Sequence, residues 1–142
     1  MLLGTFEGRV DAQGRVVIPQ RFREQLEGGI VLARGFDGCI DVYPPREWDE
    51  VAANVKRFSR YNRNARLARR LTFSGAYKAS MDRQGRVVVP TSLRQHASIT
   101  EEIVITGQDT YLEIWSRDRW RDEEAQEANL AEIAEGLESA NG

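Results

Sequence analysis

The chain carries one sequence pattern twice, and this internal repeat constrains its fold more than any other feature. Residues Asp11–Pro19 read DAQGRVVIP, and Asp82–Pro90, 71 positions later, read DRQGRVVVP. The same offset aligns Gly4–Phe6 with Gly75–Tyr77, and the similarity continues past the motif as far as Trp120. A repeat of this length predicts two copies of one structural unit that bury a core together.

The length of 142 residues is near the usual size of one domain. We therefore expect a single domain, 1–142, made of two repeats. Repeat 1 is assigned to residues 4–50 and repeat 2 to residues 75–120. Residues 51–74 form a helical, Arg-rich connector between them, and residues 121–142 form an acidic C-terminal helix or tail.

The local sequence pattern of each repeat predicts the same order of short strands and helices. In repeat 1, Thr5–Val10 leads into the motif, and a β-branched run stopped by Pro19 follows it. Asp-x-x-Gly supplies a side-chain acceptor and a glycine that accepts positive φ, so the two flanking strands are predicted to form a hairpin. A short helix, strands at Gly29–Ala33 and Cys39–Tyr43, and a helix that begins at Pro45 complete the unit.

The fold class follows from the shortness of these strands. Repeat 2 predicts matching strands at Glu102–Thr106 and Tyr111–Trp115. Four short strands are too few to close a core, because a lone hairpin is marginal in water. We therefore predict an α+β fold with a mainly β core, in which two repeats close a small barrel about a pseudo-twofold axis and the helices are peripheral.

Charge is distributed unevenly along the chain. The net charge is −2, which is unlike the strongly basic surfaces that nucleic-acid-binding proteins often carry. Residues 118–142 hold eight acidic side chains and two arginines, so the rest of the chain carries +4. The segment Lys56–Leu71 holds seven cations and no acid.

Three interpretations stay open for each charged segment. The cationic segment is a solvated helix face, a subunit interface or a phosphate-binding patch. The acidic tail is a solvated helix, an intersubunit arm or a mimic of DNA that competes for the basic surface. The spacing of the residues does not choose among these interpretations.

Residue usage argues against several function classes. The single Cys39 and the single His96 leave no internal disulfide and no zinc site of the usual kind. The sequence lacks a phosphate-cradling glycine loop and a nucleophile–base signature, so we expect no enzyme, no cofactor, no metal and no small-molecule substrate. No stretch approaches the ~20 apolar residues that cross a bilayer, so we expect a cytoplasmic protein without a membrane partner.

The repeated motif offers a candidate binding site. A guanidinium group can contact a phosphate or the O6/N7 edge of guanine, and a nearby Asp can hold it in one rotamer. Two such turns on a twofold scaffold predict double-stranded DNA as a partner. The alternative is a self-contained turn in which Arg only pairs with its own Asp. The candidate residues are Asp11, Arg15, Asp82 and Arg86, with Arg9, Lys78 and Arg83 as weaker candidates.

The doubled motif, the following segments REQL (23–26) and LRQHA (93–97), and the early Gly-Thr-Phe resemble the MraZ family of bacterial transcriptional regulators. The resemblance covers about Met1 to Trp120. It implies an AbrB-like swapped-hairpin β-barrel with helices, DNA binding through the Asp-x-x-x-Arg motifs, and action at the promoter of the division and cell-wall gene cluster. It also implies a ring-shaped homo-oligomer. Under this resemblance the DNA-binding roles belong to Asp11, Arg15, Asp82 and Arg86.

Together these points predict a sequence-specific, nucleoid-associated transcriptional regulator that binds promoter repeats as an oligomer. Assembly would compensate for the low positive charge, because several subunits on one DNA gain avidity through effective concentration. Two alternatives remain. One is a ring-forming scaffold or adaptor that does not bind DNA. The other is an AbrB-like antitoxin, although such chains usually carry one motif and a disordered toxin-binding tail.

Overall fold

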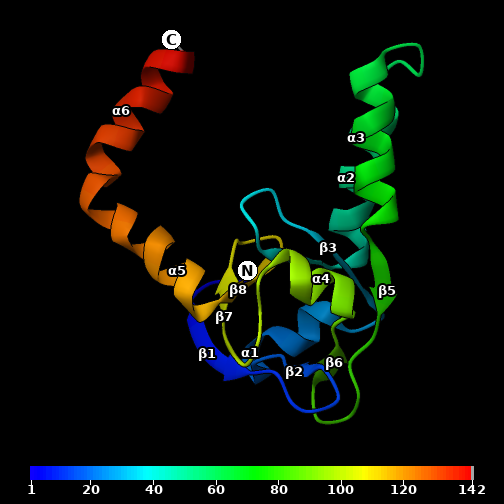
Figure 1. Cartoon of the computed structure of the whole chain (residues 1–142), viewed down its shortest axis with the longest axis vertical. Coiled ribbons are helices and arrows are strands. Elements are labelled where there is room, and N and C mark those ends of the chain that lie inside the picture. Colours follow the sequence, from blue (N-terminus) through cyan, green and yellow to red (C-terminus); the bar gives the residue numbers. More distant parts are fainter. Residues whose placement is uncertain (142) are drawn as a thin grey trace.

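Both repeats of the computed structural model, which describes residues 1–141, follow the order of two strands, a short helix, two strands and a helical arm (Figure 1). The strands are β1 (Thr5–Arg9), β2 (Arg15–Val17), β3 (Ile30–Arg34), β4 (Ile40–Tyr43), β5 (Tyr77–Ala79), β6 (Arg86–Val88), β7 (Glu102–Gly107) and β8 (Leu112–Ser116). The helices are α1 (Gln20–Arg23), α2 (Pro45–Lys56), α3 (Arg63–Ser74), α4 (Thr91–His96), α5 (Arg117–Glu124) and α6 (Leu130–Asn141). Two short 3-10 helices are η1 (Glu24–Leu26) and η2 (Ala125–Asn129). The α+β class and the predicted order of elements are confirmed.

Local capping explains where the longer helices begin. Pro45 occupies the first turn of α2, where the missing N–H of proline costs no hydrogen bond. The Asn62 side chain accepts a hydrogen bond from the backbone N–H of Ala65 at 3.1 Å and caps α3. Ser116 caps α5 in the same way, accepting from the backbone N–H of Arg119 at 3.2 Å.

The prediction that the two strands of each motif form a hairpin is wrong. All strand pairs are antiparallel, but β1 pairs with β7 and β2 pairs with β6, so both flanks of the first motif pair with repeat 2. The turn itself closes locally, since the Asp11 N–H donates to the Arg15 carbonyl at 2.9 Å before the strands diverge. The strands are therefore exchanged between repeats, as the resemblance implied.

Two pairs of equivalent residues define the pseudo-twofold relation between the repeats. Val16 lies opposite Val87 in the β2–β6 ribbon, and Asp41 lies opposite Glu113 where β4 meets β8. Each pair joins residues that correspond in the two repeats. The axis therefore passes through the ribbon and through the centre of the six-stranded sheet.

The predicted closed barrel is not found in residues 1–141. The larger sheet has the order β1-β7-β8-β4-β3-β5 and ends in two edge strands, and the β2–β6 ribbon is a separate sheet. The physical reason lies in side-chain packing. The ribbon buries Val16 and Val87 in the same apolar cluster as the large sheet, so it covers the core without hydrogen-bonding the edge strands together.

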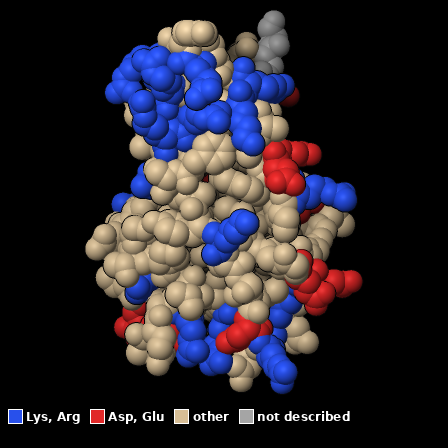
Figure 2. Space-filling view, turned by 90° about the vertical axis from the view of Figure 1, so that its right-hand side faces the viewer, with Lys and Arg blue, Asp and Glu red and all other residues tan. Residues whose placement is uncertain are grey.

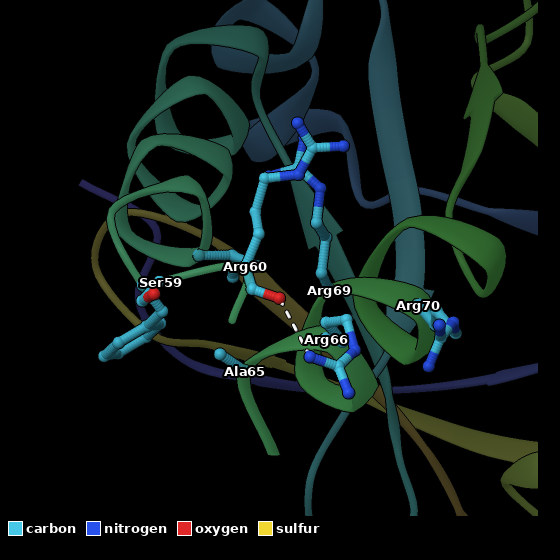
Figure 3. Close-up of a pocket in the computed structure, with 8 residues that line it drawn as sticks. Ser59, Arg60, Ala65, Arg66, Arg69 and Arg70 are labelled. Carbon is cyan, nitrogen blue, oxygen red and sulfur yellow. Dashed lines mark hydrogen bonds between the residues drawn. The ribbon is translucent and has the colours of Figure 1, made fainter. Parts of the chain in front are cut away.

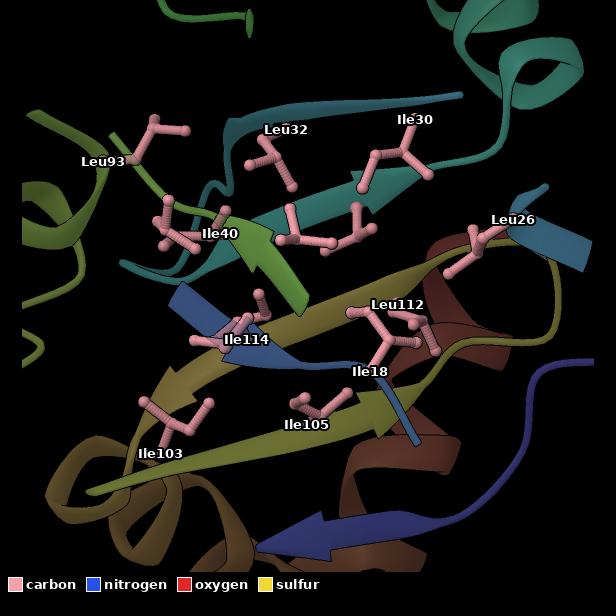
Figure 4. Close-up of a cluster of buried hydrophobic side chains, with 14 of the residues drawn as sticks. Ile18, Leu26, Ile30, Leu32, Ile40, Leu93, Ile103, Ile105, Leu112 and Ile114 are labelled. Carbon is pink, nitrogen blue, oxygen red and sulfur yellow. The ribbon is translucent and has the colours of Figure 1, made fainter. Parts of the chain in front are cut away.

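One main core joins both repeats (Figure 4). Leu32 and Ile40 of repeat 1 pack in a single cluster with Ile105 and Ile114 of repeat 2, and each is at most 2% exposed. Full burial of such a side chain stabilises a fold by about 1.5–3 kcal/mol. The apolar residues of both repeats are thus buried in one shared core.

Two helical arms leave this body on opposite sides (Figure 1). One arm is α2 and α3, whose Trp48 and Phe73 rings meet edge to face, and Trp48 also packs against Tyr43 of β4 with ring centroids 5.9 Å apart. The other is α5, η2 and α6, in which every residue from 121 to 140 is exposed. Across residues 1–141, no helix has the length and apolar character needed to span a membrane.

Candidate nucleic-acid interface

The first motif forms a turn in which one carboxylate organises both backbone and side chain. Oδ1 of Asp11 accepts hydrogen bonds from the backbone N–H groups of Gln13 and Arg15, both at 2.9 Å. Oδ2 accepts from Nε of Arg15 at 2.7 Å. Gly14 completes the turn with φ of +78°, a conformation that a residue with a Cβ adopts at a cost. Asp11 therefore shapes the turn and orients the arginine at once.

The second motif repeats this geometry. Oδ1 of Asp82 accepts from the backbone N–H groups of Gln84 and Arg86, both at 2.9 Å, and Oδ2 accepts from Nε of Arg86 at 2.6 Å. In both motifs the backbone N–H of the arginine is the main cause that lowers the pKa of the aspartate below its ordinary value. Both carboxylates thus stay ionised and paired at neutral pH.

The outer face of the β2–β6 ribbon brings the two motif arginines together. The register sets each arginine opposite an exposed valine, in the pairs Arg15–Val88 and Val17–Arg86. Because side chains alternate along a strand, the buried Val16 and Val87 point inward and both arginines share the outer face. They are diagonal neighbours, whose Cα atoms lie about 7–8 Å apart in such a register. Their side chains are 27% and 32% exposed.

Each arginine keeps part of its guanidinium for a ligand. Nε is held by the aspartate, and the terminal amino groups remain as donors, although Nη2 of Arg15 also lies 3.4 Å from Oε1 of Gln13. A guanidinium fixed at one edge loses less conformational freedom when it binds. The arrangement therefore suits planar acceptors such as phosphate oxygens or the edge of guanine.

Sequence reasoning missed two further arginines beside the turns. Arg23, the last residue of α1, lies against Gly85 of repeat 2, while Arg94 of α4 lies against Gly14 of repeat 1. Nε of Arg23 donates to the carbonyl of Ile18 at 2.9 Å, and Arg94 makes the equivalent bond to Val89 at 3.1 Å. The signal was present in the sequence, since Arg23 and Arg94 are separated by the same 71 residues as the motifs.

The three weaker candidates lie in different surroundings. Arg9 and Lys78 lie on β1 and β5, the two edge strands of the large sheet, so neither is part of the ribbon. Arg9 also forms ion pairs with Glu101 at 3.3 Å and Glu102 at 3.7 Å.

Arg83, by contrast, is exposed in the second turn. Together with Arg23 it lines a cavity of about 330 Å³ that also contains Asp82 and Glu27. Arg83 is thus the one weaker candidate that lies within a motif turn. Its counterpart in the first turn is Ala12, so the two turns differ in charge.

Comparison with known proteins decides the family. The family described as "MraZ protein, putative antitoxin-like" matches the chain twice, over residues 1–71 and 72–139. The chain belongs to the MraZ family. The two matched segments each contain one Asp-x-x-Gly-Arg turn, so the MraZ match follows the same division as the internal repeat.

Curated members of the MraZ family are similar over most of their length. A protein from Herpetosiphon aurantiacus is 46% identical over 121 residues, which is 85% of each chain. One from Clostridium acetobutylicum is 40% identical over 137 residues, 96% of each chain, and one from Thermoanaerobacter sp. (strain X514) is 38% identical over 142 residues, 99% of each chain. All three are named transcriptional regulator MraZ, which describes a regulator and not an enzyme.

Proposed function

We propose that this chain is a sequence-specific DNA-binding transcriptional regulator. One observation carries the proposal: the pseudo-twofold axis places two arginines, Arg15 and Arg86, on one exposed ribbon face, each held by an aspartate. The names of its relatives support a role in transcription regulation. The target that the resemblance implies is the promoter of the division and cell-wall gene cluster, so the protein acts on the nucleoid.

The pseudo-twofold axis favours a duplex as the ligand. In duplex DNA the two strands are antiparallel, and proteins with twofold symmetry bind sites whose sequence mirrors that symmetry. Arg15 and Arg86 then read equivalent groups on the two strands. Arg23 and Arg94, one beside each turn, supply further donors for the flanking phosphates.

The low net charge favours assembly on repeated sites. A single chain offers few phosphate contacts, so its own affinity is weak and salt-sensitive. Several subunits of a homo-oligomeric ring that engage successive promoter repeats gain affinity through effective concentration. The oligomer therefore replaces the strongly basic surface that this chain of net charge −2 lacks.

The test is a fluorescence-anisotropy titration at several salt concentrations. The probes are a duplex from upstream of this protein's own operon and a scrambled duplex of the same length. Arg15→Ala and Arg86→Ala should lose the preference for the operon duplex, because each removes one base- or phosphate-reading group. Arg46→Ala, at an exposed site on α2, is the matched control and should bind as wild type does.

Two outcomes overturn the proposal. Equal wild-type binding to both duplexes removes sequence specificity. Binding that neither motif mutation changes returns both arginines to a purely local role in the turn. Either result favours the ring-forming scaffold.

A further inference from the structure

Helix α6 presents an apolar stripe that packs against nothing within its own chain. Leu130, Ile133 and Leu137 are 63%, 43% and 60% exposed, and Ala134 lies between them on the same face. The spacing i, i+3, i+4, i+7 is the pattern with which an amphipathic helix enters an apolar groove. A twelve-residue helix is marginal in water without tertiary packing, so α6 needs a partner surface.

The arm of α2 and α3 offers such a groove. A cavity of about 360 Å³ lies between this arm and the β3–β4 hairpin. Its apolar lining includes Phe36, Tyr43, Trp48, Val51, Val55 and Leu71. Leu71 is 51% exposed and Leu67, one turn earlier on α3, is 39% exposed, so apolar surface continues along the helix beyond the cavity.

The two arms carry opposite charge. Four arginines of the α2–α3 arm, Arg60, Arg66, Arg69 and Arg70, line a second cavity, in which Nη1 of Arg66 donates to the Arg60 carbonyl at 2.9 Å (Figure 3). The segment Lys56–Leu71 contains no acid, whereas α6 contains three glutamates and no cation. Crowded like charges repel one another until an oppositely charged surface covers them.

Geometry excludes two simple occupants of the groove. The chain's own α6 lies on the opposite side of the body from α2 and α3 (Figure 1). The basic side chains over the α2–α3 arm gather at the far end of the molecule from the motif turns (Figure 2). A straight duplex bound to the ribbon therefore does not also cover this arm.

We propose that α6 of one copy of this chain docks in the groove along α2 and α3 of a second copy. Its apolar stripe enters the groove, and Glu135 and Glu138, which lie on one flank of that stripe, face the arginines of α3. Each chain then gives α6 to one neighbour and receives α6 from another, a head-to-tail contact that closes into a ring if the rotation allows. This subunit contact rests on the proposed function only in taking the protein to be a homo-oligomer.

The first test compares two full-length variants that each add one carboxylate to α6. Ile133→Asp places it in the apolar stripe, and Ser139→Asp places it on the opposite face of the same helix. The mass of each species is measured by light scattering after size-exclusion chromatography. We expect the Ile133→Asp variant to lose the oligomer that the wild type and Ser139→Asp form. A monomeric wild type, or equal masses for both variants, overturns the inference.

Charge reversal tests the partner surface. Arg66→Glu with Arg70→Glu reverses α3, and Glu135→Arg with Glu138→Arg reverses α6. Either pair alone should abolish the oligomer, and all four changes in one chain should restore it, because complementarity returns with opposite sign. An oligomer that survives either pair, or that the combination fails to restore, contradicts the contact.

DNA binding, measured on a duplex with one promoter repeat, separates this inference from the proposed function. If Ile133→Asp is monomeric and still prefers that repeat, both stand. If every variant stays oligomeric while the preference persists, the contact is wrong and the regulator stands. If the wild type lacks the preference while Ile133→Asp loses the oligomer, the contact stands and the regulator falls. Loss of the single-repeat preference by the Arg66 and Arg70 pair overturns the inference in favour of DNA as the occupant of this arm.

Discussion

The guanidinium of Arg23 lies so close to Gly85, in the turn of the other repeat, that a Cβ at position 85 would clash with it. The reverse contact also exists, since a Cβ at Gly14 would lie 3.1 Å from Cζ of Arg94. Each short helix therefore holds an arginine against the motif turn of the opposite repeat. The glycines serve two purposes at these positions: they accept positive φ and they leave room for the arginine.

Replacing Gly85 by alanine separates these two purposes. Gly85→Ala should lower the free energy of unfolding by roughly 1–2 kcal/mol, because an L-residue is strained at its φ of +75°. Gly28→Ala is the matched control, since Gly28 has φ of +90° and a Cβ there meets nothing within 4 Å. Chemical denaturation should show a similar loss for both variants. Only Gly85→Ala should also weaken binding to the operon duplex, because it displaces Arg23. Equal weakening by both variants would contradict a role for this contact.

The motif aspartates should determine specificity more than affinity. Asp82→Asn keeps an oxygen for the backbone N–H groups of Gln84 and Arg86 but loses the ion pair to the arginine. Removing a negative charge strengthens binding to every duplex, so the preference for operon over scrambled DNA is the quantity to measure. We expect that ratio to fall roughly three- to tenfold, the cost of ordering one freed side chain. An unchanged ratio would show that the aspartate only shapes the turn.

The salt dependence of binding reports phosphate contacts by Arg23 and Arg94. If each contacts one phosphate, its replacement by alanine should reduce the slope of log K against log salt by about 1 for each protein–DNA site. Arg9→Ala is the control, because Arg9 is already paired with Glu101 and Glu102. Anisotropy titrations from low to moderate salt measure the slope. If Arg9→Ala changes the slope of log K against log salt and Arg23→Ala does not, the phosphate contact belongs to Arg9 and not to Arg23.

Stability should depend on pH through Asp41. Burial raises the pKa of this carboxyl to about 6, while the Tyr43 hydroxyl donates to it at 2.7 Å. The folded state therefore binds a proton that the unfolded state releases near pH 4, so this stabilisation is complete below pH 4 and is lost as pH rises through 6. The loss amounts to roughly 2–3 kcal/mol.

The variant Asp41→Asn isolates this effect, since asparagine does not titrate. Urea denaturation between pH 4 and pH 7.5 should show a wild-type decline that the variant lacks. Parallel curves for the two proteins would mean that Asp41 keeps an ordinary pKa. Glu113, which lies opposite Asp41 across the β4–β8 pair, adds to the rise of the Asp41 pKa by like-charge repulsion, and Asp41→Asn removes this repulsion as well.

Local patterns predicted the elements well. The strands at Gly29–Ala33 and Cys39–Tyr43 were placed within one residue of β3 and β4, and the helix that begins at Pro45 was confirmed. These predictions depend on residues close together in the sequence, such as β-branched runs, turn glycines and first-turn prolines. The pairing of each arginine with its aspartate, proposed for the Asp-x-x-Gly-Arg motif, also lies within five residues and was found in both copies.

By itself, the sequence determined that there are two equivalent units, where their turns and helices begin, and which arginine each turn orients. The tertiary structure alone decided that β2 pairs with β6, that the sheet ends in two edges instead of closing, and that Arg23 lies against Gly85. The reason is that the two repeats carry the same apolar pattern, so pairing within a repeat and pairing between repeats satisfy it equally. Only burial of both repeats in one core makes the exchanged pairing the stable one.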